Sequence, residues 1–208
     1  MTKQPSGNLK DKIYSQVFES IIRGEYKPND ILSEKNLVEK YNVSKSPVRE
    51  ALIELCNEGI LRSIPRFGYE VIRITDRDVK EIKEYRILLE CGCIDRYWDM
   101  ITPYHVEYLQ GFLCNKDLEC DLLEHWKRNS QFHLTLISCF KNEYIYNCLK
   151  DSLRFLARAY VQFYWDQWYQ TVFYNTDDLH DKIIESFKKN NKEQVLYYLK
   201  QDINEFEE

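Results

Sequence analysis

The chain has 208 residues, of which 44% are hydrophobic and 30% are charged, and its net charge is −5 at pH 7. This length suits one core or two modest ones, and the composition is that of an ordinary soluble globular protein. The sequence has no internal repeats and no low-complexity tracts. No apolar run approaches the roughly 20 residues that span a bilayer, which argues against a membrane protein.

The charge is unevenly distributed along the chain. Residues 1–75 contain 12 Lys and Arg against 10 Asp and Glu, whereas the remainder contains 17 against 24. The N-terminal part is therefore the better candidate for binding an anionic partner. The N-terminus lacks the apolar stretch of a secretory signal, and the seven cysteines have the irregular spacing of buried thiols. We expect a cytoplasmic protein.

Short elements separated by Gly and Pro are predicted before residue 76. The apolar spacing and the capping residues predict helices over residues 9–23, 33–41 and 44–58, and alternation around Pro-Arg-Phe-Gly predicts a hairpin over residues 60–74. The third helix has an apolar face made of Val48, Ala51, Leu52 and Leu55. Three helices followed by a hairpin is the order of a winged helix-turn-helix domain.

The remaining residues have little Gly or Pro and show helical periodicity throughout. Helices are predicted at residues 76–100, 103–113, 116–140, 142–171, 177–190 and 192–206. Nothing after residue 75 is typical of a strand. We therefore predict a mainly α protein, with a winged helix-turn-helix in residues 1–75 and an antiparallel all-α bundle of six or seven helices in residues 76–208.

Two cations, Lys45 and Arg49, lie at the start of the third helix, on one side and away from its apolar face. In a helix-turn-helix this turn enters the major groove, where cations reach phosphates or guanine edges. Ser44 and Ser46 can bond phosphates, and Arg66 stands at the hairpin tip. Alternatively, these charges are only solvated, as most surface charges are. Their coincidence with a capped turn and a basic hairpin favours DNA binding.

The segment ILSEKNLVEKYNVSKSPVREALIELCNEGILRSIPRFGYEV closely resembles the signature of GntR-type bacterial transcription regulators. The resemblance implies a regulator that binds operator DNA as a homodimer and reads an inverted repeat. It implies DNA contacts at Ser44, Lys45, Ser46, Arg49, Arg66 and Gly68. Lys45 and Phe67 replace arginines of the family pattern, so a different operator preference is expected.

The helical part is similar, more weakly, to the all-helical effector-binding (FCD) domain of the FadR-like subgroup. The similar segments are DVKEIKEYRILLE, NSQFHLTLISCFKNEYI and LHDKIIESFKKNNKEQVLYYLKQDI. Many members of that subgroup bind a divalent metal through one Asp and three His, and the metal holds a carboxylate effector. The corresponding positions here are Asn129, His133, His180 and Asp202. The resemblance thus implies a site for Zn, Ni or Mn with two imidazoles and two oxygen donors.

Three arginines, Arg86, Arg154 and Arg158, are candidates for holding an effector carboxylate through a charge-assisted fork. Interhelical salt bridges explain them equally well. The aromatic run of residues 160–175 suits either the wall of an effector pocket or packing in a core or dimer interface.

Two other functional interpretations stay open. His133 lies among apolar residues and could be a hydrogen-bonded core histidine, in a regulator that has lost its metal and senses an apolar ligand. A metalloenzyme with an accessory DNA-binding domain is the third interpretation. It lacks a His-Glu-x-x-His motif, a Gly-rich phosphate loop and a nucleophile elbow, so we do not expect an enzyme.

Overall fold

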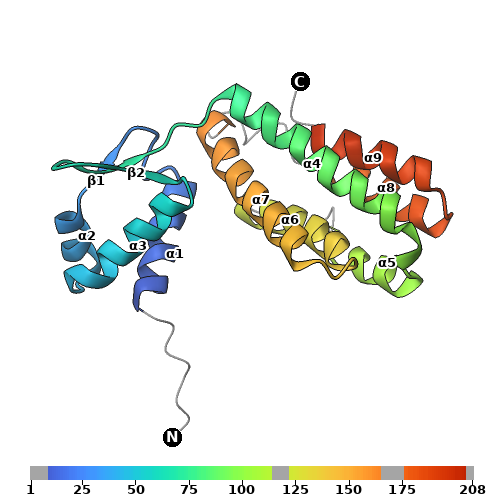
Figure 1. Cartoon of the computed structure of the whole chain (residues 1–208), viewed down its shortest axis with the longest axis horizontal. Helices are drawn as coiled ribbons and strands as arrows, with labels where there is room; N and C mark the ends of the chain where they lie inside the picture. Colours follow the sequence, from blue (N-terminus) through green and yellow to red (C-terminus); the bar gives the residue numbers. More distant parts are fainter. Residues whose placement is uncertain (1–8, 114–121, 165–175, 205–208) are drawn as a thin grey trace, which may run out of the picture. The chain divides into compact units, whose positions relative to one another are not determined.

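The computed structural model describes residues 9–113, 122–164 and 176–204 (Figure 1). The chain divides into two compact units, one of residues 1–75 with 158–165 and the other of residues 76–157 with 166–208. The units are described separately below; helix α7 (Glu143–Tyr164) belongs to the second unit up to Ala157 and to the first from Arg158.

The first unit contains three helices and a small antiparallel sheet. Its elements are α1 (Leu9–Ile22), β1 (Ile31–Leu32), α2 (Glu34–Tyr41), α3 (Lys45–Asn57), β2 (Leu61–Ile64) and β3 (Gly68–Val71). Strand β3 lies between β1 and β2, pairing Leu32 with Tyr69 and Ser63 with Tyr69. The predicted winged helix-turn-helix is confirmed. The sheet has a third strand, β1, which sequence periodicity missed because two residues are too short to show alternation.

Local signals explain where these helices begin and end. The Ser33 hydroxyl accepts a hydrogen bond from the Asn36 N–H at 3.1 Å and so caps α2. Asn42 (φ 50°) ends α2 in the left-handed conformation that asparagine tolerates. Apolar residues of the three helices and the sheet then share one core, which includes Val17, Leu32, Leu37, Val48, Leu52, Leu55 and Leu61. Burying each such side chain contributes about 1.5–3 kcal/mol.

The second unit is helical in the residues that the structure describes. Its elements are α4 (Asp76–Tyr97), a 3₁₀ turn η1 (Trp98–Met100), α5 (Pro103–Gln110), α6 (Leu122–Ser138), α7 (Glu143–Tyr164), α8 (Thr176–Lys188) and α9 (Lys192–Asn204). Helix α9 packs against both α8 and α4, and α5 packs against α8 and α6. This confirms the predicted fold class. None of the described helices is long and apolar enough to cross a bilayer.

Two predicted boundaries were wrong by a few residues. The first predicted helix of this unit tightens to 3₁₀ geometry at Trp98, and the second ends at Gln110, because the N–H of Gly111 turns back to the carbonyl of Tyr108 at 3.1 Å. Residues 165–175, which carry most of the aromatic run, lie outside the described residues.

Candidate DNA-binding and ligand-binding sites

The start of α3 presents its polar side chains to solvent. Ser44 is the N-cap residue, but its hydroxyl forms no capping hydrogen bond. The side chains of Lys45 and Arg49 are 70% and 64% exposed, whereas Val48 and Leu52, on the other face of the helix, are fully buried. The structure thus brings the predicted cations together on one exposed turn, and the uncapped N–H groups there favour an anion.

A carboxylate on α2 lies beside both cations. Glu34 Oε2 lies 3.1 Å from Lys45 Nζ, and Glu34 Oε1 lies 3.7 Å from Arg49 Nε. Glu34 also accepts a hydrogen bond from the Tyr69 hydroxyl at 3.0 Å. Burial by itself would raise the pKa of Glu34, but the bonds from Lys45 and Tyr69 hold that pKa below its usual range. Glu34 therefore connects α2, α3 and the wing strand β3. The sequence motif contains this residue, yet sequence reasoning assigned it no role.

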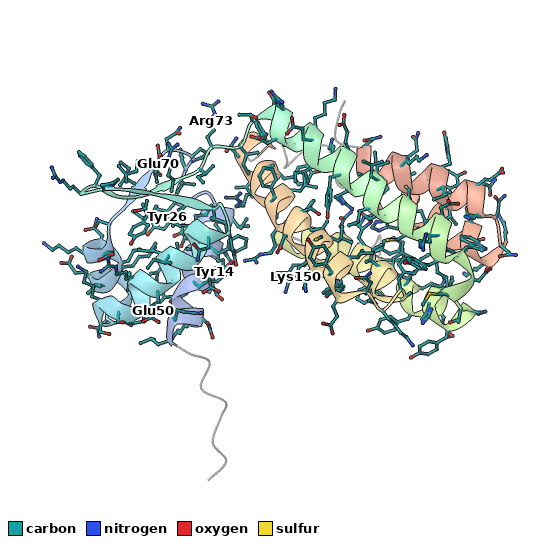
Figure 2. The ribbon with its side chains drawn as sticks, viewed as in Figure 1. Tyr14, Tyr26, Glu50, Glu70, Arg73 and Lys150 are labelled. Atoms are coloured by element: carbon teal, nitrogen blue, oxygen red, sulfur yellow. The ribbon has the colours of Figure 1, made fainter. Side chains whose placement is uncertain are left out.

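The wing carries the other predicted DNA contacts. Arg66 is exposed at the tip with a φ of 71°, and Gly68 has a φ of 134°. A Cβ at position 68 would lie only 2.4 Å from the backbone oxygen of Leu32, so only glycine fits there. On α3 the Ser46 hydroxyl donates to Glu50, labelled in Figure 2, at 2.8 Å. The backbone N–H of Ser46 lies in the first turn of α3, where helix geometry leaves N–H groups without a partner inside the helix.

In the second unit, three of the four predicted metal ligands converge. His133 on α6, His180 on α8 and Asp202 on α9 are all buried, and each offers a ligand atom within 4.8 Å of the others. Positions 180 and 202 stand equally far from Asn191, where the chain turns, so antiparallel packing of α8 and α9 places them side by side. Phe132 stacks on the His180 ring at 3.8 Å between centroids.

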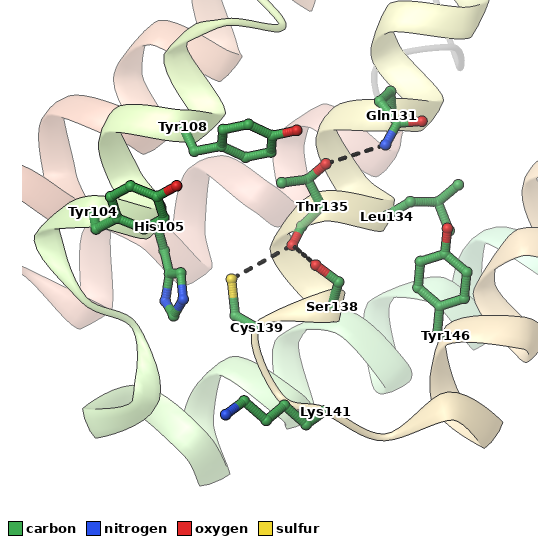
Figure 3. Close-up of a pocket in the computed structure, with 10 residues that line it drawn as sticks. All are labelled: Tyr104, His105, Tyr108, Gln131, Leu134, Thr135, Ser138, Cys139, Lys141 and Tyr146. Carbon is green, nitrogen blue, oxygen red and sulfur yellow. Dashed lines mark hydrogen bonds between the residues drawn. The ribbon is translucent and has the colours of Figure 1, made fainter.

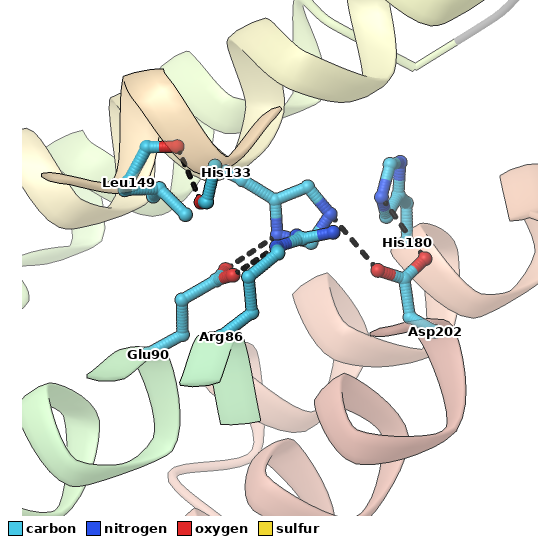
Figure 4. A network of polar contacts seen from close by, with 7 residues as sticks. Arg86, Glu90, His133, Leu149, His180 and Asp202 are labelled. Atoms are coloured by element: carbon cyan, nitrogen blue, oxygen red, sulfur yellow. Dashed lines mark hydrogen bonds and ion pairs between the residues drawn. The ribbon is translucent and has the colours of Figure 1, made fainter. Parts of the chain in front are cut away.

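A second carboxylate orients His133 from behind (Figure 4). Glu90 on α4 contacts His133 Nδ1 at 2.7 Å and also accepts a hydrogen bond from Arg86 Nε at 2.7 Å. With Nδ1 turned to Glu90, His133 Nε2 faces Asp202 at 2.9 Å, where it pairs with that carboxylate when protonated and offers its lone pair to an ion when neutral. This carboxylate–histidine arrangement is common behind metal ligands. The segment DVKEIKEYRILLE contains both Arg86 and Glu90, but the partnership of Glu90 with His133 was not predicted.

The charges of this cluster support one another. Burial would raise the pKa of both carboxyl groups. The cations of Arg86 and His133 instead hold the pKa of Glu90 below its usual value, and His180 and His133 hold that of Asp202 well below it. Burial lowers the pKa of His133, but Glu90 and Asp202 outweigh it and raise that pKa. Both carboxylates are therefore ionised at neutral pH, as ligands or partners of ligands must be.

The donor set fits a divalent ion. Among the described residues, His133 Nε2, His180 Nε2 and Asp202 Oδ1 are buried and lack a partner in hydrogen-bond geometry. His133 Nε2 nevertheless lies 2.9 Å from Asp202 Oδ2, and His180 Nε2 lies 3.2 Å from Asp202 Oδ1. Ligands bound at about 2.1 Å to one ion are themselves about 3 Å apart, so these spacings are compatible with a shared ion. Asn129 is buried one helical turn before His133.

The three candidate effector arginines lie in different surroundings. Arg86 is buried beside the His133 cluster, and its Nη2 has no hydrogen-bond partner among the described residues. Arg154 is partly buried on α7, and burial lowers its pKa. Arg158 belongs to the first unit, where its Nη1 donates to the carbonyl of Gly59 at 3.2 Å. Of the three, only Arg86 has both a position next to the cluster and an unused buried donor.

A half-open pocket of about 270 Å³ lies elsewhere in the second unit (Figure 3). Helix α5 contributes Tyr104, His105 and Tyr108 to it, and α6 contributes a face that includes Thr135 and Ser138. That face of α6 excludes His133, and none of the predicted site residues lines the pocket. The buried cluster, rather than this pocket, holds the chemistry expected from the sequence.

Together, the winged helix-turn-helix unit with its exposed basic turn and the helical unit with its buried polar cluster define a class of protein: a DNA-binding regulator with an appended helical domain. Residues 9–71 match the model of the bacterial regulatory proteins of the gntR family, and this part of the chain belongs to that family.

Relatives named as transcription regulators, the first of them as an uncharacterized one, support the same class. The chain is 27% identical to the HTH-type transcriptional regulator YdhC of Bacillus subtilis (strain 168), over 88% of this chain and 82% of that protein. It is 27% identical to the gluconate operon transcriptional repressor of the same organism, over 90% and 79%. It is 33% identical to the transcriptional repressor RspR of Escherichia coli (strain K12), over 64% and 59%. These relatives are transcription regulators, not enzymes.

Solved structures share the fold. McbR/YncC of E. coli superposes with a TM-score of 0.77 at 20% identity, covering 95% of this chain and 94% of that one. The regulator GntR from Rhodococcus sp. RHA1 superposes with a TM-score of 0.71 at 22% identity, covering 94% of each chain. At these identities the likeness concerns the fold alone.

Proposed function

We propose that this chain is a ligand-responsive, DNA-binding transcription regulator that acts as a cytoplasmic repressor. The observation that carries the proposal is the exposed turn at the start of α3, where Lys45 and Arg49 project from a buried three-helix core. Several similar proteins are named as repressors, which supports that sign of regulation.

The helical unit would supply the input signal. His133, His180 and Asp202 would hold a Zn, Ni or Mn ion, with Asn129 as a fourth donor, and such an ion when bound would accept an oxygen of a carboxylate effector. Arg86 would hold the same effector through its unused Nη2. Arg154 stays a weaker candidate for this role, and Arg158 the weakest, because it already bonds Gly59.

The protein would bind its operator as a homodimer. On the second unit, Tyr85 and Leu88 of α4 are 37% and 78% exposed, and Tyr144 of α7 is 80% exposed. Burial raises the pKa of Tyr85 to about 12. The nearby side chains of Cys148 and Tyr144 add smaller contributions in the same direction. Tyr85 and Leu88 lie three residues apart on one side of α4, and a second copy of the chain would cover this side. Two such chains would read an inverted repeat.

DNA binding is tested by selecting duplexes from a random pool with the wild-type chain and measuring the affinity of the enriched duplex. Arg49→Ala is expected to weaken binding about 10- to 100-fold, the worth of one good base contact, and to reduce the salt slope. Arg23→Ala is the matched control, since Arg23 is an exposed arginine at the end of α1. If the wild-type chain enriches no duplex at any salt concentration, the proposal is wrong.

Metal binding is tested independently of DNA. After chelator treatment, calorimetric titration with Zn²⁺, Ni²⁺ and Mn²⁺ is expected to show one site per chain that His133→Ala abolishes. The alternative function, a metal-free regulator, has its own support, because the His133–Asp202 and His180–Asp202 distances also suit direct ion pairs. Absence of binding for all three ions in the wild-type chain would favour that alternative.

A further inference from the structure

The tip of the wing exposes an aromatic side chain that the proposed DNA contacts do not use. Phe67 is 71% exposed, more than any other large apolar residue of the first unit in the described residues; the next is Ile31 at 51%. A single exposed apolar residue is ordinary on a protein surface. The place of Phe67 within a rigid turn, beside a cation, is what distinguishes it.

The turn holds the ring in a defined position. The N–H of Phe67 bonds the carbonyl of Ile64 at 3.1 Å, and the flanking residues Arg66 and Gly68 both have positive φ. A Cβ at Gly68 would clash with the backbone oxygen of Leu32, so the turn requires glycine next to Phe67. Exposure of Phe67 is therefore a property of the folded wing, and the free chain gains little from burial of this side chain.

The surroundings of the ring combine apolar and positive character. The register places Ile31, Ile64 and Gly68 on the outer face of the sheet, where Ile31 lies against Gly68. Glu70, on the same face and labelled in Figure 2, is paired with Arg62. The exposed Arg66 precedes Phe67 directly. The wing tip thus presents an apolar side chain next to a cation. This combination suits the DNA minor groove, whose walls are deoxyribose and whose edges carry phosphates.

We propose that Phe67 enters the DNA minor groove beside the segment that α3 reads and packs against deoxyribose and a base step. This inference rests on the proposed DNA-binding function. Apolar side chains that enter the minor groove partly unstack base steps, and pyrimidine–purine steps open most easily. Phe67 is then a specificity-determining residue. It favours such a step at the wing position and contributes affinity that does not depend on salt.

The experiment uses the full chain and the duplex enriched from a random pool by the wild-type protein. Phe67→Ala is expected to weaken binding about tenfold, with no change in the slope of log K against log salt, because no counterion is released by an apolar contact. Phe67→Arg is expected to steepen that slope by about 0.9, the value for one added phosphate contact. A pyrimidine–purine step at the wing position of the duplex is expected to matter for the wild type and not for Phe67→Ala.

Two controls separate this inference from the proposed function. Leu9→Ala removes another exposed apolar side chain of the first unit and is expected to leave affinity unchanged. Wild-type affinity of Phe67→Ala at every salt concentration, with Arg49→Ala still defective, would overturn the role of Phe67 and leave DNA binding standing. A weaker dimer with unchanged DNA affinity in Phe67→Ala would assign the ring to a protein contact and equally overturn it. Failure of the wild type to enrich any duplex would remove both proposals.

Discussion

At the scale of single residues, the buried cluster of the helical unit depends on mutual pairing. An unpaired buried charge destabilises the folded state by roughly several kcal/mol. Removing one member of a buried pair therefore leaves the other member as such an unpaired charge. Here Arg86 faces Glu90, Glu90 faces His133, and His133 and His180 face Asp202. Each residue therefore both stabilises and orients the next, and substitutions should act beyond the side chain that is changed.

Glu90 is expected to control the metal affinity of His133 without touching the ion. In Glu90→Gln the amide is a weaker acceptor for Nδ1–H, so His133 loses basicity and its fixed orientation, and Zn²⁺ affinity should fall about 10- to 100-fold. Calorimetric titration measures this, with Glu84→Gln as the matched exposed carboxylate on the same helix. Unchanged affinity in a folded Glu90→Gln protein would show that Glu90 plays no part in the site.

Asp202 predicts a pH dependence of stability in the metal-free protein. The imidazoles of His180 and His133 hold its folded pKa well below the unfolded value of about 3.9. The contribution of Asp202 to folding stability is therefore fully present above the unfolded pKa. This contribution is lost as the pH falls from the unfolded pKa toward the folded pKa. The melting temperature of the wild type should exceed that of Asp202→Asn at pH 6. The difference should shrink between roughly pH 5 and pH 3, on either side of the ordinary pKa of an Asp carboxyl group. A constant difference across this range would contradict the pairing.

At the scale of elements, the turns decide how the wing is built. Gly59 and Gly68 both have positive φ but have different surroundings: a Cβ at Gly68 would meet the Leu32 carbonyl, whereas nothing lies within 4 Å of a Cβ at Gly59. The wing therefore has a steric requirement at Gly68 in addition to the conformational one. This difference is a property of strand packing, since β1 is distant from Gly68 in sequence.

Gly68→Ala is expected to destabilise the wing by about 1–3 kcal/mol more than Gly59→Ala, whose cost is the left-handed backbone alone at about 1 kcal/mol. Urea denaturation, combined with hydrogen exchange of the β3 amides, measures both substitutions. DNA affinity should fall for Gly68→Ala because the tip shifts. Equal costs for the two substitutions would mean that β1 yields to the added methyl group.

At the scale of the whole molecule, regulation requires that ligand binding favour one arrangement of two DNA-binding units over another. A homodimer formed through the helical units would make that arrangement a property of the assembly. The exposed side of α4 that carries Tyr85 and Leu88 is the surface proposed for this contact.

Leu88→Glu is expected to weaken the dimer at least about tenfold, because a carboxylate would be buried at the centre of the contact. Sedimentation velocity over a range of concentrations measures the change. Tyr197→Glu is the control, since Tyr197 is 58% exposed on α9. A Leu88→Glu protein that sediments as the wild type does would exclude this face as the dimer interface.

Local sequence signals determined most of the fold. The caps at Ser33 and Asn42, the apolar spacing of α3 and the turn around Pro65–Gly68 act between near neighbours, so the winged unit and the exposure of Lys45 and Arg49 followed from the sequence alone. The role of β1 did not, because two residues carry no periodicity and only pairing with β3 defines them as a strand.

Tertiary structure decided the partners of the buried polar groups. Arg86 was a candidate either for an effector carboxylate or for a salt bridge between helices, and the fold places its Nε on Glu90 of the same helix while leaving Nη2 unused. Glu90 and His133 are 43 positions apart, and their 2.7 Å contact arises because the fold brings α4 and α6 to the same buried cluster. The sequence by itself names residues that can bind metal or anions. Whether they meet depends on helix packing over long separations, which no local pattern records.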